Sequence, residues 1–179
     1  MALTTDGPGR SGGPGGPTGN RWIVPSTLLA SAAGLGVSIY LTIAHYTATV
    51  ALACPETSTI NCEKVTTSPE SMVFGIPVAV LGLVYFVAMV GLNSPMAWRS
   101  EAPVVRWVRL LTAVVGVGFV GWLVYAELFK VDAICLWCTS VHVINFILFC
   151  LIAIGTAATS AGGREAVADG RESAASAVR

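Results

Sequence analysis

The chain has 179 residues, of which 54% are hydrophobic and only 11% are charged, and its mean hydropathy is +0.73. This apolar surplus exceeds what a soluble core of this size needs, so the composition indicates a membrane protein. Acidic and basic residues balance to a formal net charge of +0, and no basic face indicates nucleic acid as a partner.

The two ends of the chain are polar and rich in small residues. Residues 1–20 are rich in Gly and Pro, with Asp6 and Arg10 as their only charged side chains, so we expect a disordered tail. The residues near Met1 contain no short apolar core, so we expect no cleaved signal peptide. Residues 161–179 are expected to form a second soluble tail, which leaves residues 21–160 as one membrane domain.

Four apolar segments fill this domain. They run from about Trp22 to Tyr46, from Phe74 to Leu92, from Leu110 to Phe129 and from Leu136 to about Ala158. Each reaches the roughly 20 residues that a spanning helix needs, and backbone polar groups in lipid must be paired within their own element. The sequence therefore predicts an all-α membrane protein, a bundle of four transmembrane helices. Ala30, Gly34 and Ser38 form a stripe of small residues on the first segment, which indicates close helix packing.

Basic residues are divided unevenly between the two sides of such a bundle. One side, which holds both termini, carries Arg10, Arg21, Arg99, Arg106, Arg109, Arg164, Arg171 and Arg179. The other side carries only Lys64 and Lys130. Because cytoplasmic loops carry the excess of basic residues, we expect both termini in the cytoplasm of a multi-pass cell-membrane protein. The loop of residues 47–73, between the first two helices, then lies outside, where disulfides form and persist.

Four cysteines fall on this outer side. Cys135-Leu136-Trp137-Cys138 lies where a loop meets the fourth helix, and Cys54 and Cys62 lie in the outer loop, separated by seven residues. Unpaired N–H groups in the first turn of a helix lower the pKa of a cysteine and favour thiolate, the form that attacks disulfides. One mobile dithiol and one fixed dithiol on the same face predict a thiol–disulfide relay toward an acceptor inside the bundle.

This combination of motifs resembles the vitamin K epoxide reductase family over roughly residues 22–158. The matching stretches are Cys54, then Cys62-Glu63-Lys64-Val65-Thr66-Thr67-Ser68, then Phe74-Gly75-Ile76-Pro77, then Cys135-Leu136-Trp137-Cys138. The resemblance implies a four-helix bundle around a quinone, menaquinone or ubiquinone. It also implies that Cys138 meets the quinone and that Cys135 exchanges with a loop cysteine. Ser68 and Phe74 are the motif residues that we expect to bind the quinone.

Bacterial members of that family oxidise a thioredoxin-like, disulfide-forming protein outside the cytoplasm and reduce quinone. Some of them carry this partner as a fused domain. This chain ends in a short tail, so the resemblance implies a separate thioredoxin-fold partner. Vertebrate members have a tyrosine one turn after the second active cysteine, where this chain has His142. That departure bears on epoxide reduction and not on dithiol–quinone chemistry.

Helical phase places further polar residues beside the active cysteines. Cys135, Cys138, His142 and Asn145 are offset by three, four and three residues, so they share one face of the fourth helix. Polar side chains within a membrane helix normally turn toward the bundle interior. His142 and Asn145 are therefore candidate hydrogen-bond donors to the quinone, with interhelical hydrogen bonds as the alternative. Glu127 is expected at the membrane interface.

These observations predict a membrane thiol–quinone oxidoreductase that generates disulfides outside the cytoplasm. A reduced partner would attack Cys54, Cys62 would exchange with Cys135, and Cys138 would pass electrons to the quinone. Two alternatives stay open. A non-enzymatic tetraspan scaffold or adhesion protein explains the loop pair and the helices but not the Cys-x-x-Cys. A four-cysteine zinc site is disfavoured by the long spacing of the loop pair and by the oxidising side, so no metal is expected.

Overall fold

The computed structural model describes residues 20–47, 52–100 and 102–177. Apart from Asn20, the predicted N-terminal tail lies outside these residues. The element order is α1 (Asn20–Tyr46), α2 (Cys62–Thr66), the 3-10 turn η1 (Pro69–Ser71), β1 (Met72–Val73), β2 (Ile76–Pro77), α3 (Val78–Leu92), α4 (Pro95–Arg99), α5 (Pro103–Ala126), the π-helix η2 (Glu127–Val131) and α6 (Leu136–Ala177).

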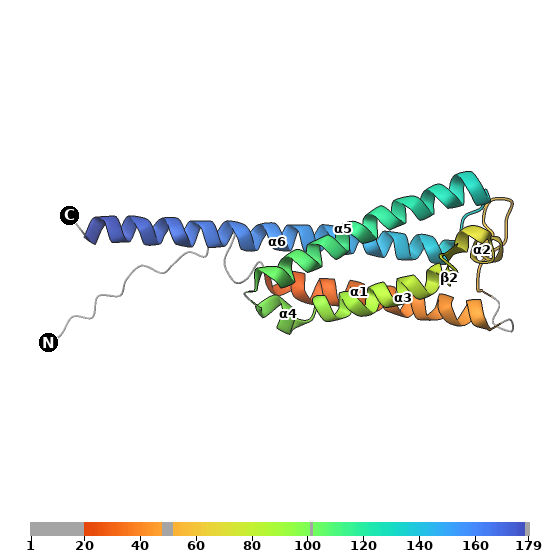
Figure 1. Ribbon diagram of the computed structural model, residues 1–179, viewed down its shortest axis with the longest axis horizontal. Coiled ribbons are helices and arrows are strands. Elements are labelled where there is room, and N and C mark those ends of the chain that lie inside the picture. Colours follow the sequence, from red (N-terminus) through yellow and green to blue (C-terminus); the bar gives the residue numbers. More distant parts are fainter. Residues whose placement is uncertain (1–19, 48–51, 101, 178–179) are drawn as a thin grey trace.

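Four helices, α1, α3, α5 and α6, form an elongated bundle (Figure 1). Helix α1 packs against α3 and α6, and α5 packs against α6. The short α2 and the β1–β2 hairpin lie at one end of the bundle, and α4 lies at the other end (Figure 1). Helix α6 continues well beyond the bundle at the α4 end, so it runs past its predicted end near Ala158. Its last part is rich in alanine, the strongest helix former.

Three helices in the described ranges are long and apolar enough to cross a membrane. They are Trp22–Tyr46, Pro103–Val131 and Leu136–Ser160. Helix α3 is apolar but has only 15 residues, so its length is about 22 Å against the roughly 30 Å of a bilayer's hydrocarbon core. The structure therefore shows a mostly helical protein with three candidate spans and a shorter apolar helix.

The second predicted helix begins later than expected. Met72–Val73 pairs with Ile76–Pro77 in an antiparallel hairpin, and Phe74 and Gly75 form its turn with φ angles of 51° and 78°. Positive φ does not belong to a right-handed helix, so the prediction that the helix starts at Phe74 is wrong. Pro77 is the N-cap, and α3 begins after it.

The third helix begins earlier than predicted, at Pro103 rather than Leu110. Proline is favoured in the first turn, where its missing N–H costs nothing. Arg109 is then almost fully buried, and its guanidinium donates to the carbonyl oxygens of Leu92 and Ala97, both at 3.0 Å. It also lies 3.7 Å from the ring centroid of Trp98. These contacts satisfy a charge that hydropathy alone would place outside the helix.

The bundle core lies where α3, α5 and α6 meet. Phe86, Met89, Ala113, Leu148 and Ile152 form a cluster of buried side chains. Helix α1 reaches this cluster through the predicted stripe of small residues, because a Cβ atom at Gly34 would overlap the ring of Phe86. Close approach of α1 and α3 therefore depends on the absence of a side chain at this position.

We predict that Gly34→Ala destabilises the bundle, because the added methyl group meets the Phe86 ring and overpacking costs about 1–3 kcal/mol. Gly36→Ala is the matched control, since a Cβ atom there meets nothing within 4 Å and gains the same helix propensity. Thermal unfolding of both variants in detergent micelles measures the difference. Equal melting temperatures for the two variants would contradict this packing.

Candidate functional site

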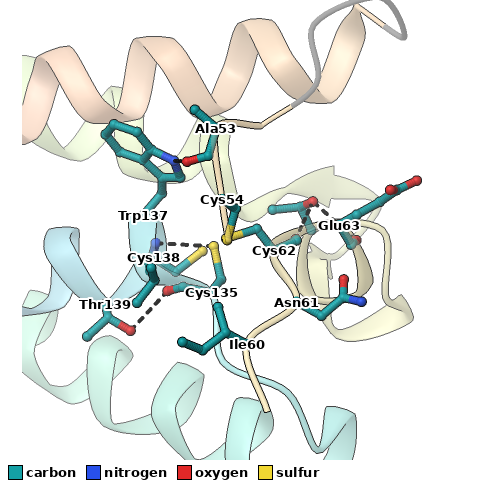
Figure 2. The surroundings of a disulfide bond; sticks show 12 residues. Ala53, Cys54, Ile60, Asn61, Cys62, Glu63, Cys135, Trp137, Cys138 and Thr139 are labelled. Atoms are coloured by element: carbon teal, nitrogen blue, oxygen red, sulfur yellow. Dashed lines mark hydrogen bonds between the residues drawn. A yellow bond between two sulfur atoms is a disulfide. The ribbon is translucent and has the colours of Figure 1, made fainter. Parts of the chain in front are cut away.

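The two cysteine pairs meet at the α2 end of the bundle. Cys54 and Cys62 form a disulfide, while Cys135 and Cys138 are free thiols. Figure 2 shows the loop disulfide beside the sulfur of Cys135. Cys62 and Cys135 belong to one buried cluster, with Cys54 and Cys138 packed against it. The structure thus brings together the four cysteines that the sequence singles out.

Backbone pairing holds the outer loop against the segment that precedes α6. The N–H of Asn61 donates to the carbonyl oxygen of Ile134 at 3.1 Å, and the N–H of Ile134 donates to that of Thr59 at 2.9 Å. These bonds form a parallel bridge between Ile60 and Ile134. Next to it, the Asn61 side chain caps α2 by accepting from the N–H of Lys64 at 2.8 Å. Cys62 is therefore fixed close to Cys135.

Two aromatic side chains hold the other arm of the loop. The indole N–H of Trp137 donates to the carbonyl oxygen of Ala53 at 3.0 Å, and the N–H of Ala53 donates to the Tyr40 hydroxyl at 3.1 Å. The two rings are in contact, with centroids 4.8 Å apart. Cys54 follows directly and stays half-buried, whereas Cys62 is 1% exposed. Of the two disulfide sulfurs, Cys54 is the one that an outside thiol reaches.

The Cys135 thiol lies immediately before the first residue of α6 and is fully buried. The hydrogen bond from the Cys138 side chain lowers its pKa most, and the backbone N–H groups of Cys138 and Trp137 lower it further. Burial acts in the opposite direction, and the resulting pKa is about 7. The N–H of Cys138 lies 3.3 Å from the Cys135 sulfur. The two backbone N–H groups act as the sequence predicts for a helix start, whereas the larger effect of the Cys138 side chain is not predicted from it.

An apolar cavity of about 290 Å³ opens behind the cysteines, between α1, α3, α5 and α6. Cys138 lines it, and so do Ser68, His142 and Asn145. Apolar side chains form most of the remaining wall. A cavity that is mainly apolar with a few convergent polar groups is typical of a site for a small organic molecule.

The comparison with protein families decides what this arrangement is. The model of the Vitamin K epoxide reductase family matches residues 25–153. The chain belongs to this family. Comparison with curated proteins finds no match. Family membership makes the chain a membrane thiol–disulfide oxidoreductase, which agrees with two cysteine pairs in contact at one end of a helical bundle.

The four residues that the sequence predicts to bind a quinone differ from one another in burial and in hydrogen bonding. His142 is 7% exposed and, among the described residues, makes no hydrogen bond. Asn145 accepts from the Tyr85 hydroxyl at 2.6 Å, so its oxygen is used in a contact between α6 and α3. Ser68 donates to the carbonyl oxygen of Val65 at 2.8 Å. Phe74 lies fully exposed in the turn of the hairpin and does not line the cavity, so its role stays a prediction.

Sequence reasoning missed one residue of this site, Glu127. The sequence predicts an interfacial position for it, and the structure shows that its side chain is 8% exposed and lines the cavity. Its carboxylate accepts a hydrogen bond from the backbone N–H of Cys135. The signal that could have found it is general: an ionisable residue within a membrane helix marks a functional site by default.

The described residues include no group of three or more His, Cys, Asp or Glu side chains that could hold a metal ion. The loop disulfide also ties up two of the four thiols that a zinc site would need.

We predict that the rate at which iodoacetamide alkylates Cys135 reaches half of its maximum near pH 7. The protein is solubilised in detergent, and its loop disulfide is kept intact. Thiolate is the reactive form, so the rate falls as pH drops below this value. Cys138→Ala removes the side-chain donor that lowers the pKa most, and the midpoint should then move to higher pH. Cys150→Ala, on the same helix, should leave it unchanged. Mass spectrometry measures the modified fraction, and identical midpoints in Cys138→Ala and the parent would contradict this origin of the shift.

We also predict that Trp137→Phe loosens the Cys54 arm, because phenylalanine keeps a ring beside Tyr40 but cannot donate to Ala53. Loss of one hydrogen bond of about 1 kcal/mol corresponds to a roughly fivefold faster opening of the loop. The measurement is the rate at which a water-soluble phosphine reduces the Cys54–Cys62 disulfide. The control is Trp122→Phe, since Trp122 is a half-exposed residue of α5. Equal reduction rates for both variants would show that the indole N–H of Trp137 does not stabilise the loop.

Proposed function

We propose that the chain is a membrane thiol–quinone oxidoreductase that reoxidises a separate, extracytoplasmic thioredoxin-like protein. One observation carries the proposal. A loop disulfide packs against Cys135, and Cys138, one turn further along α6, lines an apolar cavity. A path for electrons therefore leads from the outer loop, through two pairs of sulfurs, to a site for an apolar acceptor.

The first step is attack by a thiolate of the partner on Cys54. Exposure favours this sulfur, since Cys62 is buried beneath the loop. The attack forms a mixed disulfide with Cys54 and releases Cys62 as thiolate. A second partner thiol then resolves the mixed disulfide, so the partner leaves oxidised and the loop pair is left as a dithiol.

The second step passes the electrons to the helix pair when that pair is a disulfide. Cys62 thiolate attacks Cys135 and displaces Cys138, and Cys54 then attacks Cys62 to restore the loop disulfide. Backbone pairing through Ile134 keeps Cys62 beside Cys135 throughout this exchange. The low pKa of Cys135 makes it a good leaving group in the last displacement.

The cavity fits a quinone ring by its size, by its apolar wall and by the position of His142. His142 is buried on the Cys138 face of α6 without a hydrogen bond among the described residues, so its ring is available to a carbonyl oxygen. Asn145 contributes through its side-chain amide, whose oxygen is already held by Tyr85. A bound quinone, menaquinone or ubiquinone, supplies the capacity to take up two electrons and two protons from the dithiol.

The proposed orientation places the cysteine pairs outside the cytoplasm. Arg99 of α4, with Arg106 and Arg109 in the first turns of α5, lies at the bundle end opposite α2 (Figure 1). Lys64 and Lys130 lie in α2 and η2, at the cysteine end. The excess of arginine at the α4 end favours that end as the cytoplasmic one.

Quinone reduction by the purified protein, with a thioredoxin-fold dithiol as electron donor, tests this function. The wild type and Cys150→Ala should both reduce a short-chain quinone. Cys138→Ala should lose this activity by more than about 10²-fold, the scale expected when a reacting group is removed. In this variant Cys135 keeps Cys62 as exchange partner but has no deeper thiol to displace it, so a Cys62–Cys135 disulfide should accumulate. Mass spectrometry identifies it, and turnover of Cys138→Ala at the wild-type rate would refute the assignment.

A further inference from the structure

A buried carboxyl group lies beside the dithiol, and the sulfur relay gives it no task. Glu127 lines the same cavity as Cys138 and accepts a hydrogen bond from the backbone N–H of Cys135. It is also close enough to the Cys138 sulfur for negative charges on the two groups to repel. It therefore binds the backbone of Cys135 and shares the wall of the cavity with Cys138.

A change in helix geometry at the end of α5 turns this carboxyl group toward the cavity. The α-helical geometry of α5 ends at Ala126, and Glu127–Val131 form a π-helical turn. The turn closes with Asp132 in the left-handed conformation and with the N–H of Ala133 donating to the carbonyl oxygen of Glu127 at 3.3 Å. Such wide turns occur frequently at functional sites. The next two residues, Leu128 and Phe129, point outward and are exposed, so the turn buries the acid and exposes apolar side chains.

No opposite charge among the described residues offsets the burial of this carboxyl group. A carboxylate in an apolar site is costly unless it is paired with a cation, and within the described ranges Glu127 forms no ion pair. The titratable groups that line the cavity with it are His45 from α1, Glu70 from η1, Tyr85 from α3, and Cys138 and His142 from α6. None of these is a permanent cation. A group in such surroundings is suited to gaining and losing a proton.

We propose that Glu127 is the proton carrier between the Cys135–Cys138 dithiol and the quinone site, an inference that rests on the function proposed above. When the dithiol becomes a disulfide, it loses two electrons and two protons, and conversion of a quinone to a quinol takes up two of each. The Cys135 proton leaves to water when that thiol ionises. Glu127, as carboxylate, takes the Cys138 proton as the sulfur–sulfur bond forms, and returns it to the reduced acceptor. The second proton of the quinol comes from water, so protons and electrons balance.

The test compares Glu127→Gln with the wild type in single turnovers. Glutamine keeps the size of the side chain and an acceptor for the Cys135 N–H, but it cannot carry a proton. Reduced protein is mixed with a short-chain quinone, and quinol formation is followed over a range of pH. We expect a roughly 10²-fold slower step in Glu127→Gln, as is typical for loss of a general acid–base group, and a changed pH profile. Glu127→Asp should recover part of the rate, and Glu56→Gln, an exposed carboxyl of the outer loop, should match the wild type.

Two measurements without quinone separate this inference from a folding defect and from the function itself. In a Cys138→Ala background, Glu127→Gln should leave the yield of the Cys62–Cys135 disulfide unchanged, which shows an intact relay. In quinone-free protein, the infrared difference between the dithiol and the Cys135–Cys138 disulfide should contain a carboxyl band that Glu127→Gln removes. Absence of that band, or a wild-type rate and pH profile in Glu127→Gln, overturns the proposal. A wild type that shows the band but reduces no quinone overturns the thiol–quinone function and leaves the coupling of Glu127 to the dithiol standing.

Discussion

The chemistry of this protein depends on the short parallel bridge between the outer loop and the segment before α6. Two backbone hydrogen bonds through Ile134 set the distance between Cys62 and Cys135. Without them, a loop that leaves α1 and returns at α3 would have to find the helix cysteines by diffusion, at the entropic cost of closing a long loop. The bridge fixes one arm of the loop disulfide, whereas in the described part of the other arm the Tyr40 and Trp137 side chains hold Ala53, next to Cys54. The loop pair thus has one buried, fixed sulfur, Cys62, and one more accessible sulfur, Cys54.

The sequence predicts the helices well because their signal is local. A run of apolar residues of sufficient length predicts α1, α5 and α6, and the Cys-x-x-Cys lies at a helix start as expected. Helix limits that depend on a particular tertiary contact could not be predicted. The start of α5 depends on carbonyl groups that receive the Arg109 guanidinium, and the start of α3 depends on a hairpin whose turn at Phe74 adopts positive φ. The hydropathy pattern of the sequence predicts neither of these arrangements.

For the polar residues of the cavity, too, the sequence predicts position but not tertiary contacts. Helical phase predicts that Cys138, His142 and Asn145 share a face, and all three line the cavity. Helical phase does not show which of these side chains is hydrogen-bonded to a neighbouring helix. Tyr85 comes from a helix far away in sequence, and its hydroxyl engages the oxygen of Asn145. Within one face, Asn145 therefore combines interhelical contact with lining of the cavity, while His142 keeps its hydrogen-bonding capacity.

The position of Glu127 separates the routes of electrons and protons. Electrons move between sulfur atoms, which requires contact along the outer end of the bundle, from Cys54 to Cys138. Protons can use any group that reaches the cavity from another direction, and the π-helical turn of η2 supplies one from the side of α5. Cys138 lines the cavity together with Glu127, whereas Cys62 and Cys135 are almost fully buried under the loop. A carboxyl group on the cavity side can therefore take the Cys138 proton directly, without a path through the sulfur atoms of the outer loop.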